Sequence, residues 1–269
     1  MSILKTNNIF FRYPTKSKNN NFSLNNINLK IFKGEFVCIL GPNGSGKSTF
    51  IKLLANVLTP TQGEIYLEDK LYRTIKIKDF AKKVSFVPQI EKIIFPYSVY
   101  EIVMMGRYPF LNLMGLENDI DHQIVISTLE LLEIKHLMHH GINEISGGEA
   151  QRALIARALV QKPEILLLDE PNAHLDIKHQ LAIFSLLNSL NKNNNLTVIA
   201  ISHDLNLAMQ FGSRALLMNN GNIVFDSIPQ NVLTSENIKD IFKVNSFLVQ
   251  NLKEDKPLIA LDYLIKNKK

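Results

Sequence analysis

The sequence predicts an α/β fold built on a parallel sheet, with an antiparallel β subdomain and an inserted α-helical subdomain. Three apolar runs predict the parallel sheet, and each lies next to a helix-compatible segment: residues 35–40 (EFVCIL), 164–168 (EILLL) and 196–202 (LTVIAIS). Strands that are covered by helices on both faces read as continuous apolar runs. A three-layer core with a parallel sheet is therefore favoured.

The other elements follow from shorter patterns. Residues 1–35 and 63–87 alternate short strands with turns, which predicts the antiparallel β subdomain. Between about 90 and 150 the pattern becomes helical, with Val125, Leu129 and Leu132 at spacings of four and three. The final part predicts a strand at 222–226 and a helix at 235–242. We expect one domain over 1–243 and a C-terminal tail over 244–269 that frays at its end.

Composition narrows the class of protein. The 269-residue chain is 46% hydrophobic, which is ample for a large core, but no window approaches the length of a membrane-spanning helix. Cys38 is the single cysteine and lies in an apolar run, which excludes an internal disulfide and suggests a core position. No signal peptide is recognisable, so a cytoplasmic protein is expected. The net charge of +5 comes from scattered lysines, which favours a solvated basic surface over nucleic-acid binding.

A phosphate-binding loop is predicted between the first apolar run and the helix after it. The segment 41–49 (GPNGSGKST) fits the pattern GxxxxGK[ST] of a P-loop nucleotide hydrolase. Its glycines let backbone N–H groups face phosphates, Lys47 supplies a charge to the outer phosphates, and Ser48 supplies a hydroxyl for Mg²⁺. The complete match disfavours a glycine-rich turn without a ligand. The predicted ATP-binding residues here are Gly41, Pro42, Asn43, Gly44, Ser45, Gly46, Lys47, Ser48 and Thr49.

Two further segments carry polar groups that suit phosphate chemistry. Asp169 and Glu170 follow a buried strand, at the end where α/β sheets bind ligands. Asp169 would lie near a magnesium ion, and Glu170 would orient or deprotonate the attacking water. An isolated LLLDE segment is also compatible with a helix N-cap. The second segment, 145–149 (ISGGE), precedes a helix and offers free amides to another anion.

The order of these segments resembles the ATPase subunits of ABC transporters, and the resemblance covers about residues 3–242. It implies that Tyr13 stacks on adenine, that Gln89 reaches the metal and the water, and that His203 contacts the γ-phosphate. It also implies that residues 172–176 (NAHLD), with Asp176, form a loop that crosses to a partner subunit. The predicted signature residues, which contact the partner's ATP, are Ser146, Gly147, Gly148 and Glu149. Ile145 and Ala150 depart from the residues usual in the family.

The resemblance further implies a homodimer, two membrane permease subunits and an extracytoplasmic binding protein, with ATP and Mg²⁺ as ligands and no nucleic acid. The protein would lie on the cytoplasmic face of the membrane as a peripheral subunit. Residues 98–110 (SVYEIVMMGRYPF) resemble importers of ferric siderophores, haem and cobalamin. From periodicity alone, that stretch is an ordinary amphipathic helix with a stop.

Several alternatives stay open. One is an importer of zinc or manganese ions, and another is a non-transport ABC ATPase, although the chain shows neither a second ATPase unit nor a long coiled coil. A binding-only module would be expected to lose Lys47, Glu170 or His203. The histidine-rich stretch 136–140 (HLMHH) lacks a clear carboxylate or cysteine partner, which disfavours a metal site there.

Overall fold

A computed structural model of the chain describes residues 2–14, 23–89, 95–111, 115–173, 175–250 and 256–262. The chain divides into two compact units. Unit 1 comprises Met1–Asp69 and Ile199–Lys269, and unit 2 comprises Lys70–Val198. No helix within the described ranges combines the length and the apolar character needed to span a membrane.

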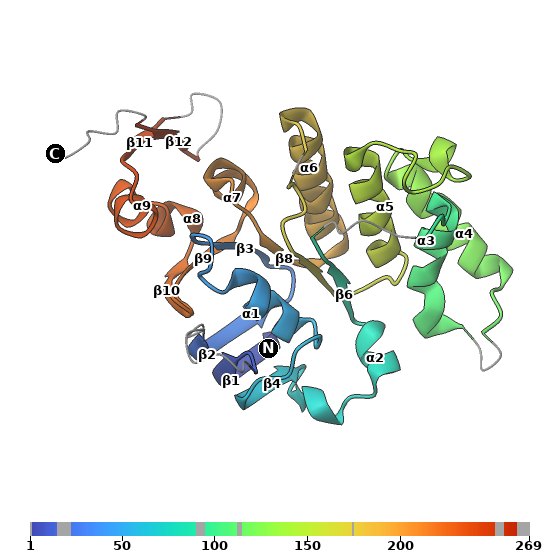
Figure 1. Cartoon of the computed structure of the whole chain (residues 1–269), viewed down its shortest axis with the longest axis horizontal. Helices are drawn as coiled ribbons and strands as arrows, with labels where there is room; N and C mark the ends of the chain where they lie inside the picture. Colours follow the sequence, from blue (N-terminus) through green and yellow to red (C-terminus); the bar gives the residue numbers. More distant parts are fainter. Residues whose placement is uncertain are drawn as a thin grey trace. The chain divides into compact units, whose positions relative to one another are not determined.

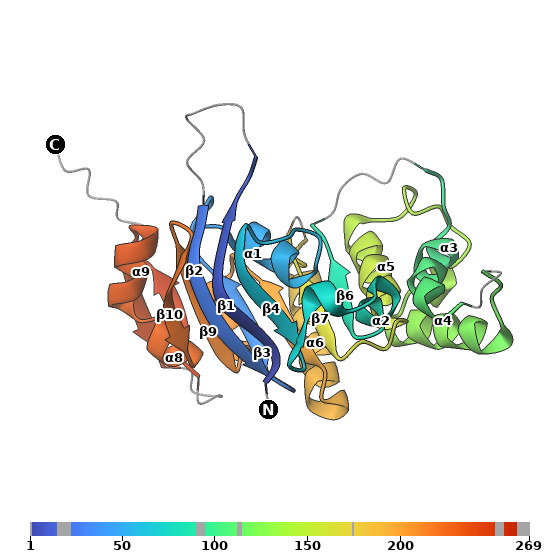
Figure 2. The same ribbon diagram turned by 90° about the horizontal axis from the view of Figure 1, so that it is seen from below.

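Unit 1 contains the antiparallel sheet that the sequence predicts. Its strands pair in the order β2-β1-β4, with bounds β1 Ser2–Arg12, β2 Ser23–Phe32 and β4 Gln62–Leu67. Both pairings are antiparallel, and Figure 2 shows the three strands side by side. Leu24, Ile27, Leu29 and Ile31 of β2 are buried, while intervening side chains are more exposed. This alternation is what a sheet with one covered face requires.

Parallel pairing within unit 1 joins β3 (Phe36–Leu40) to β9 (Arg214–Asn219). The five residues of β3 are fully buried, as the continuous apolar run predicts, and Cys38 among them is a core residue. Strand β10 (Asn222–Ser227) pairs antiparallel with β9. The helices of this unit are α1 Lys47–Leu54, α7 Leu205–Phe211, α8 Pro229–Val232 and α9 Ser235–Phe242.

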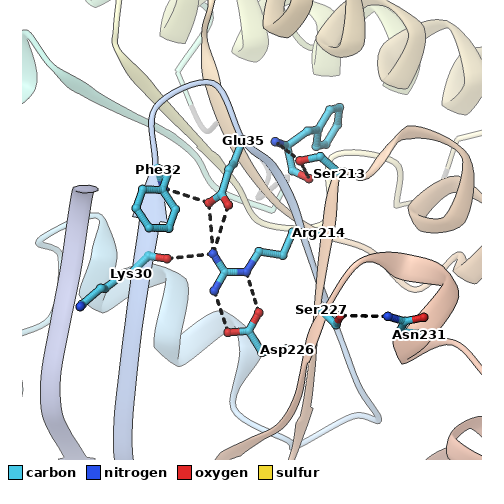
Figure 3. Close-up of polar contacts among 9 residues, drawn as sticks. Lys30, Phe32, Glu35, Ser213, Arg214, Asp226, Ser227 and Asn231 are labelled. Atoms are coloured by element: carbon cyan, nitrogen blue, oxygen red, sulfur yellow. Dashed lines mark hydrogen bonds and ion pairs between the residues drawn. The ribbon is translucent and has the colours of Figure 1, made fainter. Parts of the chain in front are cut away.

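Arg214 links several strands of unit 1 (Figure 3). Its Nε and Nη2 donate to the two carboxylate oxygens of Asp226 at 2.6 and 2.7 Å, while Nη1 donates to the Lys30 carbonyl at 2.8 Å. Nη1 also reaches both carboxylate oxygens of Glu35 at 3.2 Å. The hydrogen bonds from Arg214 to Asp226 raise the pKa of the guanidinium. Arg214 therefore ties β2 of the antiparallel sheet to the β9–β10 pair.

Unit 2 contains a second parallel pair, β6 (Val84–Val87) with β7 (Ile165–Leu168). The prediction that all of residues 63–87 belong to the antiparallel subdomain was therefore wrong for β6, because a four-residue strand gives no local signal for the direction of its partner. Near its start lie β5 Lys70–Leu71, η1 Tyr72–Thr74 and α2 Ile77–Ala81. The predicted helical region contains α3 Val99–Met104, η2 Met105–Phe110, α4 Asp119–Leu131 and η3 Lys135–Leu137, and the later helices are α5 Gly147–Leu159 and α6 Ile177–Asn194. Helices α3, α4 and α5 pack against one another (Figures 1 and 2). The three periodic residues Val125, Leu129 and Leu132 are all buried, which confirms the helical face.

Strand β8 (Thr197–Ile201) is buried along its whole length and passes from unit 2 into unit 1.

The C-terminal tail contains secondary structure that the sequence did not predict. It contains an antiparallel hairpin, β11 (Ser246–Val249) with β12 (Leu258–Leu261). Four-residue apolar runs separated by the charged segment 250–257 give too weak a pattern for a strand prediction. The hairpin depends instead on contacts with α7 and α9.

Candidate functional site

The loop 41–46 in unit 1 has the backbone of a phosphate-binding loop. Gly41, Gly44 and Gly46 have φ values of 147°, 77° and 106°, all in the region that side chains disfavour. A Cβ atom on Gly41 would lie 2.2 Å from the Met218 carbonyl oxygen, so only glycine fits between β3 and β9. Gly221 donates to the Ser45 carbonyl at 3.0 Å and holds the far side of the loop. The glycines are therefore needed for this loop shape.

Lys47 begins α1 and lies across the loop. Its Nζ donates to the carbonyls of Gly41 at 2.9 Å and Pro42 at 3.1 Å, and the residue is only 5% exposed. The ammonium is thus held among loop carbonyls where a phosphate would be bound. Ser45 Oγ is also buried and has no hydrogen-bond partner within the described residues. A buried hydroxyl without a partner is costly, and it suits a site whose acceptor is a ligand.

Tyr13 follows β1 and meets the first helix after the loop. Its hydroxyl lies 3.3 Å from Oγ1 of Thr49, and the residue is 39% exposed. Phe11 packs edge-on against the Tyr13 ring at a centroid distance of 4.8 Å. Because unit 1 holds both residues, the predicted adenine-stacking aromatic lies next to the helix that the phosphate loop opens. Its exposed ring is available to a planar ligand.

His203 also belongs to unit 1 and follows β8. The Ser202 N–H donates to the Ile39 carbonyl at 3.2 Å, so His203 leaves β8 beside the strand that leads into the loop. Its side chain is exposed. Asp204 caps α7 by accepting from the N–H groups of Asn206 at 2.8 Å and Leu207 at 3.0 Å. The cap positions His203 between a fixed strand end and a fixed helix start.

In unit 2, the two carboxylates follow β7 as predicted. Asp169 is 3% exposed, and its N–H donates to the Val87 carbonyl at 2.9 Å. Glu170 has a φ of 54°, which is uncommon for a residue with a side chain. Nε2 of Gln89 donates to Oε2 of Glu170 at 2.9 Å. The predicted water-activating carboxylate and the predicted glutamine, 81 residues apart in the chain, are therefore in direct contact.

The predicted signature segment caps α5 in unit 2. Ser146 Oγ accepts from the Glu149 N–H at 3.4 Å, and Oε2 of Glu149 accepts from the Ser146 N–H at 2.8 Å. The hydrogen bonds from Ser146 lower the pKa of Glu149. A Cβ on Gly147 would meet no atom within 4 Å. The backbone at Gly147 therefore has open space next to a helix N-terminus, where an anion is favoured.

Asp176 caps α6 by accepting from the His179 N–H at 2.9 Å, and this bond lowers the pKa of its carboxyl group. Asn172 is 7% exposed, whereas His174 of the predicted crossing loop lies outside the described residues.

Sequence reasoning missed a buried ion pair that holds the helical region together. Arg107 Nε donates to Oδ1 of Asp121 at 2.8 Å, and Nη1 donates to the Val160 carbonyl at 2.6 Å. The two side chains are 6% and 2% exposed. The guanidinium also lies 4.0 Å from the Phe110 ring centroid. Asn118 and Asp121 form a readable capping box at the start of α4, but nothing in the sequence indicates that Arg107 reaches it.

Comparison with known proteins gives consistent matches. Residues 24–173 match the model of the family described as ABC transporter. The chain is 35% identical to a petrobactin import ATP-binding protein of Bacillus anthracis, over 96% of this chain and 92% of that protein. It is also 35% identical to an iron(3+)-hydroxamate import ATP-binding protein of Bacillus subtilis, over 90% of each.

Solved structures agree. A metal-chelate type ABC transporter in an inward-facing conformation superposes with a TM-score of 0.84 at 31% identity, covering 98% of this chain and 99% of that one. A dimeric bacterial ABC transporter cassette superposes with a TM-score of 0.75 at 31% identity, covering 84% and 98%.

Proposed function

This chain belongs to the ABC transporter family, and from that premise we propose that it hydrolyses ATP to power the import of an iron chelate. The observation that carries the proposal is the loop 41–49, where glycine geometry, the buried Lys47 ammonium and the unpartnered Ser45 hydroxyl suit a bound polyphosphate. The reaction is ATP plus water to ADP plus phosphate.

Lys47 and the loop amides bind the β- and γ-phosphates in this proposal, and the ring of Tyr13 stacks on the adenine. Ser48, Gln89 and Asp169 offer hydroxyl, amide and carboxylate oxygens, the ligand type that Mg²⁺ prefers. Ser48 and Gln89 would hold the ion, with Asp169 nearby. When bound, Mg²⁺ neutralises charge on the phosphates.

Hydrolysis is assigned to three residues. Glu170 acts as the general base on the attacking water, and its contact with Gln89 supports this role because a fixed carboxylate needs no reorganisation before it accepts a proton. His203 stabilises charge on the γ-phosphate. The left-handed backbone at Glu170 also fits a functional position, since such conformations concentrate at reactive sites.

The working form is proposed to be a homodimer in which Ser146, Gly147, Gly148 and Glu149 contact the ATP held by the partner's loop, with Asp176 in the loop that crosses the interface. The solved dimeric cassette supports pairing. Two permease subunits and an extracytoplasmic binding protein complete the transporter, which puts this chain on the cytoplasmic face of the membrane as a peripheral subunit. Closure on ATP and opening after hydrolysis drive the permease.

The chemical role is tested with Glu170→Gln, a nearly isosteric change that removes the base. We expect it to bind ATP, to remain dimeric in ATP and to lose most phosphate release. Glu68→Gln, on an exposed turn of unit 1, is the matched control and should hydrolyse normally. A Glu170→Gln variant that hydrolyses ATP at the unchanged rate would show that another group is the base.

The substrate class is tested by uptake of a labelled ferric chelate into cells that lack the gene and carry either the original chain or Glu170→Gln. We expect only the original chain to restore uptake. If the deletion leaves ferric-chelate uptake unchanged in a strain without a redundant system, the iron-chelate proposal is wrong. The same strains with labelled haem, cobalamin, zinc or manganese then identify the transported class.

A further inference from the structure

His179 of α6 lies against the first turn of α5, and both helices belong to unit 2. A Cβ atom on Gly148 would be 3.3, 3.4 and 3.6 Å from Cγ, Cδ2 and Nδ1 of the His179 ring. Gly147, one residue earlier, has no atom within 4 Å of such a Cβ. The two glycines of the signature segment therefore differ, because Gly147 faces open space and Gly148 faces an imidazole.

The ring of His179 is held in place by Asp176. Oδ1 of Asp176 accepts from the His179 N–H at 2.9 Å and lies 2.8 Å from Nδ1 of the same residue. Because an ionised carboxylate can only accept, Nδ1 is the donor of the second bond. One carboxylate oxygen thus caps α6 and orients the imidazole, which restricts rotation of the ring away from Gly148.

A second observation places His179 beside the start of α5. Hydrogen bonds from Ser146 are the main cause of the lowered pKa of Glu149, and the imidazoles of His136 and His179 lower that pKa further. The carboxylate of Glu149 closes the capping box with Ser146. His179 is therefore close to the cap of α5 as well as to its second residue.

We propose that His179 is a positioning residue for ATP hydrolysis: its ring, oriented by Asp176 and packed on Gly148, sets the spacing between the signature segment and the Asp176 loop. The inference rests on the proposed function, in which both segments of one subunit act at the interface with its partner. A spacing that is fixed before the partner's ATP arrives lowers the cost of closing the dimer.

The same contact gives a reason for glycine at position 148. A Cβ atom at 3.3 Å from the ring is closer than ordinary van der Waals contact, so a neighbour would have to move by a few tenths of an ångström. Because Asp176 holds the ring, that displacement is passed to α5 or to the Asp176 loop. Replacing either Gly148 or His179 should therefore disturb the same spacing.

The test is a double-mutant cycle on the ATP hydrolysis rate of the whole chain. Gly148→Ala and His179→Ala should each lower the rate about tenfold, the first by displacing the ring and the second by removing it. If both act through one contact, the double variant also loses about tenfold, not the hundredfold product expected for independent sites. Losses that multiply in the double variant would overturn the inference.

A conservative variant and a control separate positioning from a general loss of folding. His179→Asn keeps an N–H donor near the place of Nδ1, so it should keep the bond to Asp176 and lose only about threefold in rate. His139→Ala removes an exposed histidine of the same unit and should leave the rate unchanged. Equal losses for His179→Asn and His179→Ala would show that the bond to Asp176 does not matter, and the inference would be wrong.

Binding and pairing are measured separately, with Glu170→Gln as the parent. Adding His179→Ala should leave ATP affinity unchanged in calorimetry below the pairing concentration, because the phosphate loop belongs to unit 1. The dimer dissociation constant in ATP, measured by sedimentation equilibrium, should rise about tenfold. A parent that binds ATP but never pairs would contradict the proposed function, whereas a parent that pairs with a constant unaffected by His179→Ala would overturn this inference alone.

Discussion

The phosphate loop of unit 1 and the Arg107–Asp121 pair of unit 2 are both buried and polar. They differ in whether every buried polar group has a hydrogen-bond partner. Lys47 is held by two loop carbonyls, and the neighbouring Ser45 hydroxyl has no partner within the described residues. Arg107, in contrast, donates to a carboxylate and to a backbone carbonyl and lies against the Phe110 ring.

The difference separates a site that receives a ligand from a pair that holds a fold. In the loop, polar groups lie within nine consecutive residues and keep bonding capacity for phosphate. In unit 2, the partners come from η2, α4 and the end of α5, and the charges compensate each other. Mutations in the phosphate loop should therefore mainly change ATP binding and hydrolysis. Mutations of the Arg107–Asp121 pair should mainly lower the free energy of unfolding.

Replacing the arginine gives the largest expected effect. Arg107→Ala leaves the Asp121 carboxylate buried without its partner, so the free energy of unfolding should fall by about 3–5 kcal/mol. Urea denaturation measures the loss. The double variant Arg107→Ala/Asp121→Asn should recover part of it, because the uncompensated charge is gone. If Arg107→Ala alone costs less than about 1 kcal/mol, the pair does not hold the helical region.

Replacing Lys47 tests whether the phosphate loop acts in nucleotide hydrolysis and not in stability. Lys47→Ala removes the charge that stabilises the outer phosphates, so the rate of phosphate release should fall about 10²–10³-fold. Thermal unfolding should change little. Lys52→Ala, in the same helix, is the control and should keep its activity. A Lys47→Ala variant that unfolds easily but hydrolyses normally would reverse the assignment of roles.

Gly41 and Gly147 differ in how much room the backbone leaves for a side chain. Gly41 has a φ of 147°, and the Cβ that Gly41→Ala adds would clash with the Met218 carbonyl oxygen. This variant should therefore destabilise the protein by about 1–3 kcal/mol. Gly147→Ala meets no atom within 4 Å and should leave stability unchanged or slightly higher. Thermal unfolding of both variants without nucleotide decides this. Equal effects would mean that the loop is not constrained by its contact with β9.

The smallest expected effect concerns Ser45. Ser45→Ala removes a buried hydroxyl without a partner, so the nucleotide-free protein should gain about 1 kcal/mol of stability. ATP affinity, measured by calorimetry, should fall about fivefold because one hydrogen bond to phosphate is lost. Loss of stability together with unchanged ATP affinity would assign this hydroxyl to the fold and not to the ligand.

The sequence alone was enough to predict several strands and the phosphate loop, because each depends on neighbours within about ten residues. Continuous apolar runs predicted β3, β7 and β8, and the glycine spacing predicted the loop. Ser146 and Asp169 likewise lie where local patterns predict them. The roles of the site residues in ATP hydrolysis remain predictions.

Tertiary structure decided the pairings between distant segments. Gln89 meets Glu170 only because β6 and β7 pair in parallel, and Arg107 reaches Asp121 only because the fold brings η2, the start of α4 and the end of α5 together. The C-terminal hairpin forms because Asn206 and Gln210, more than forty residues earlier, bond to its backbone. Such contacts depend on how elements pack, and a single sequence carries no periodic signal for a partner that is remote along the chain.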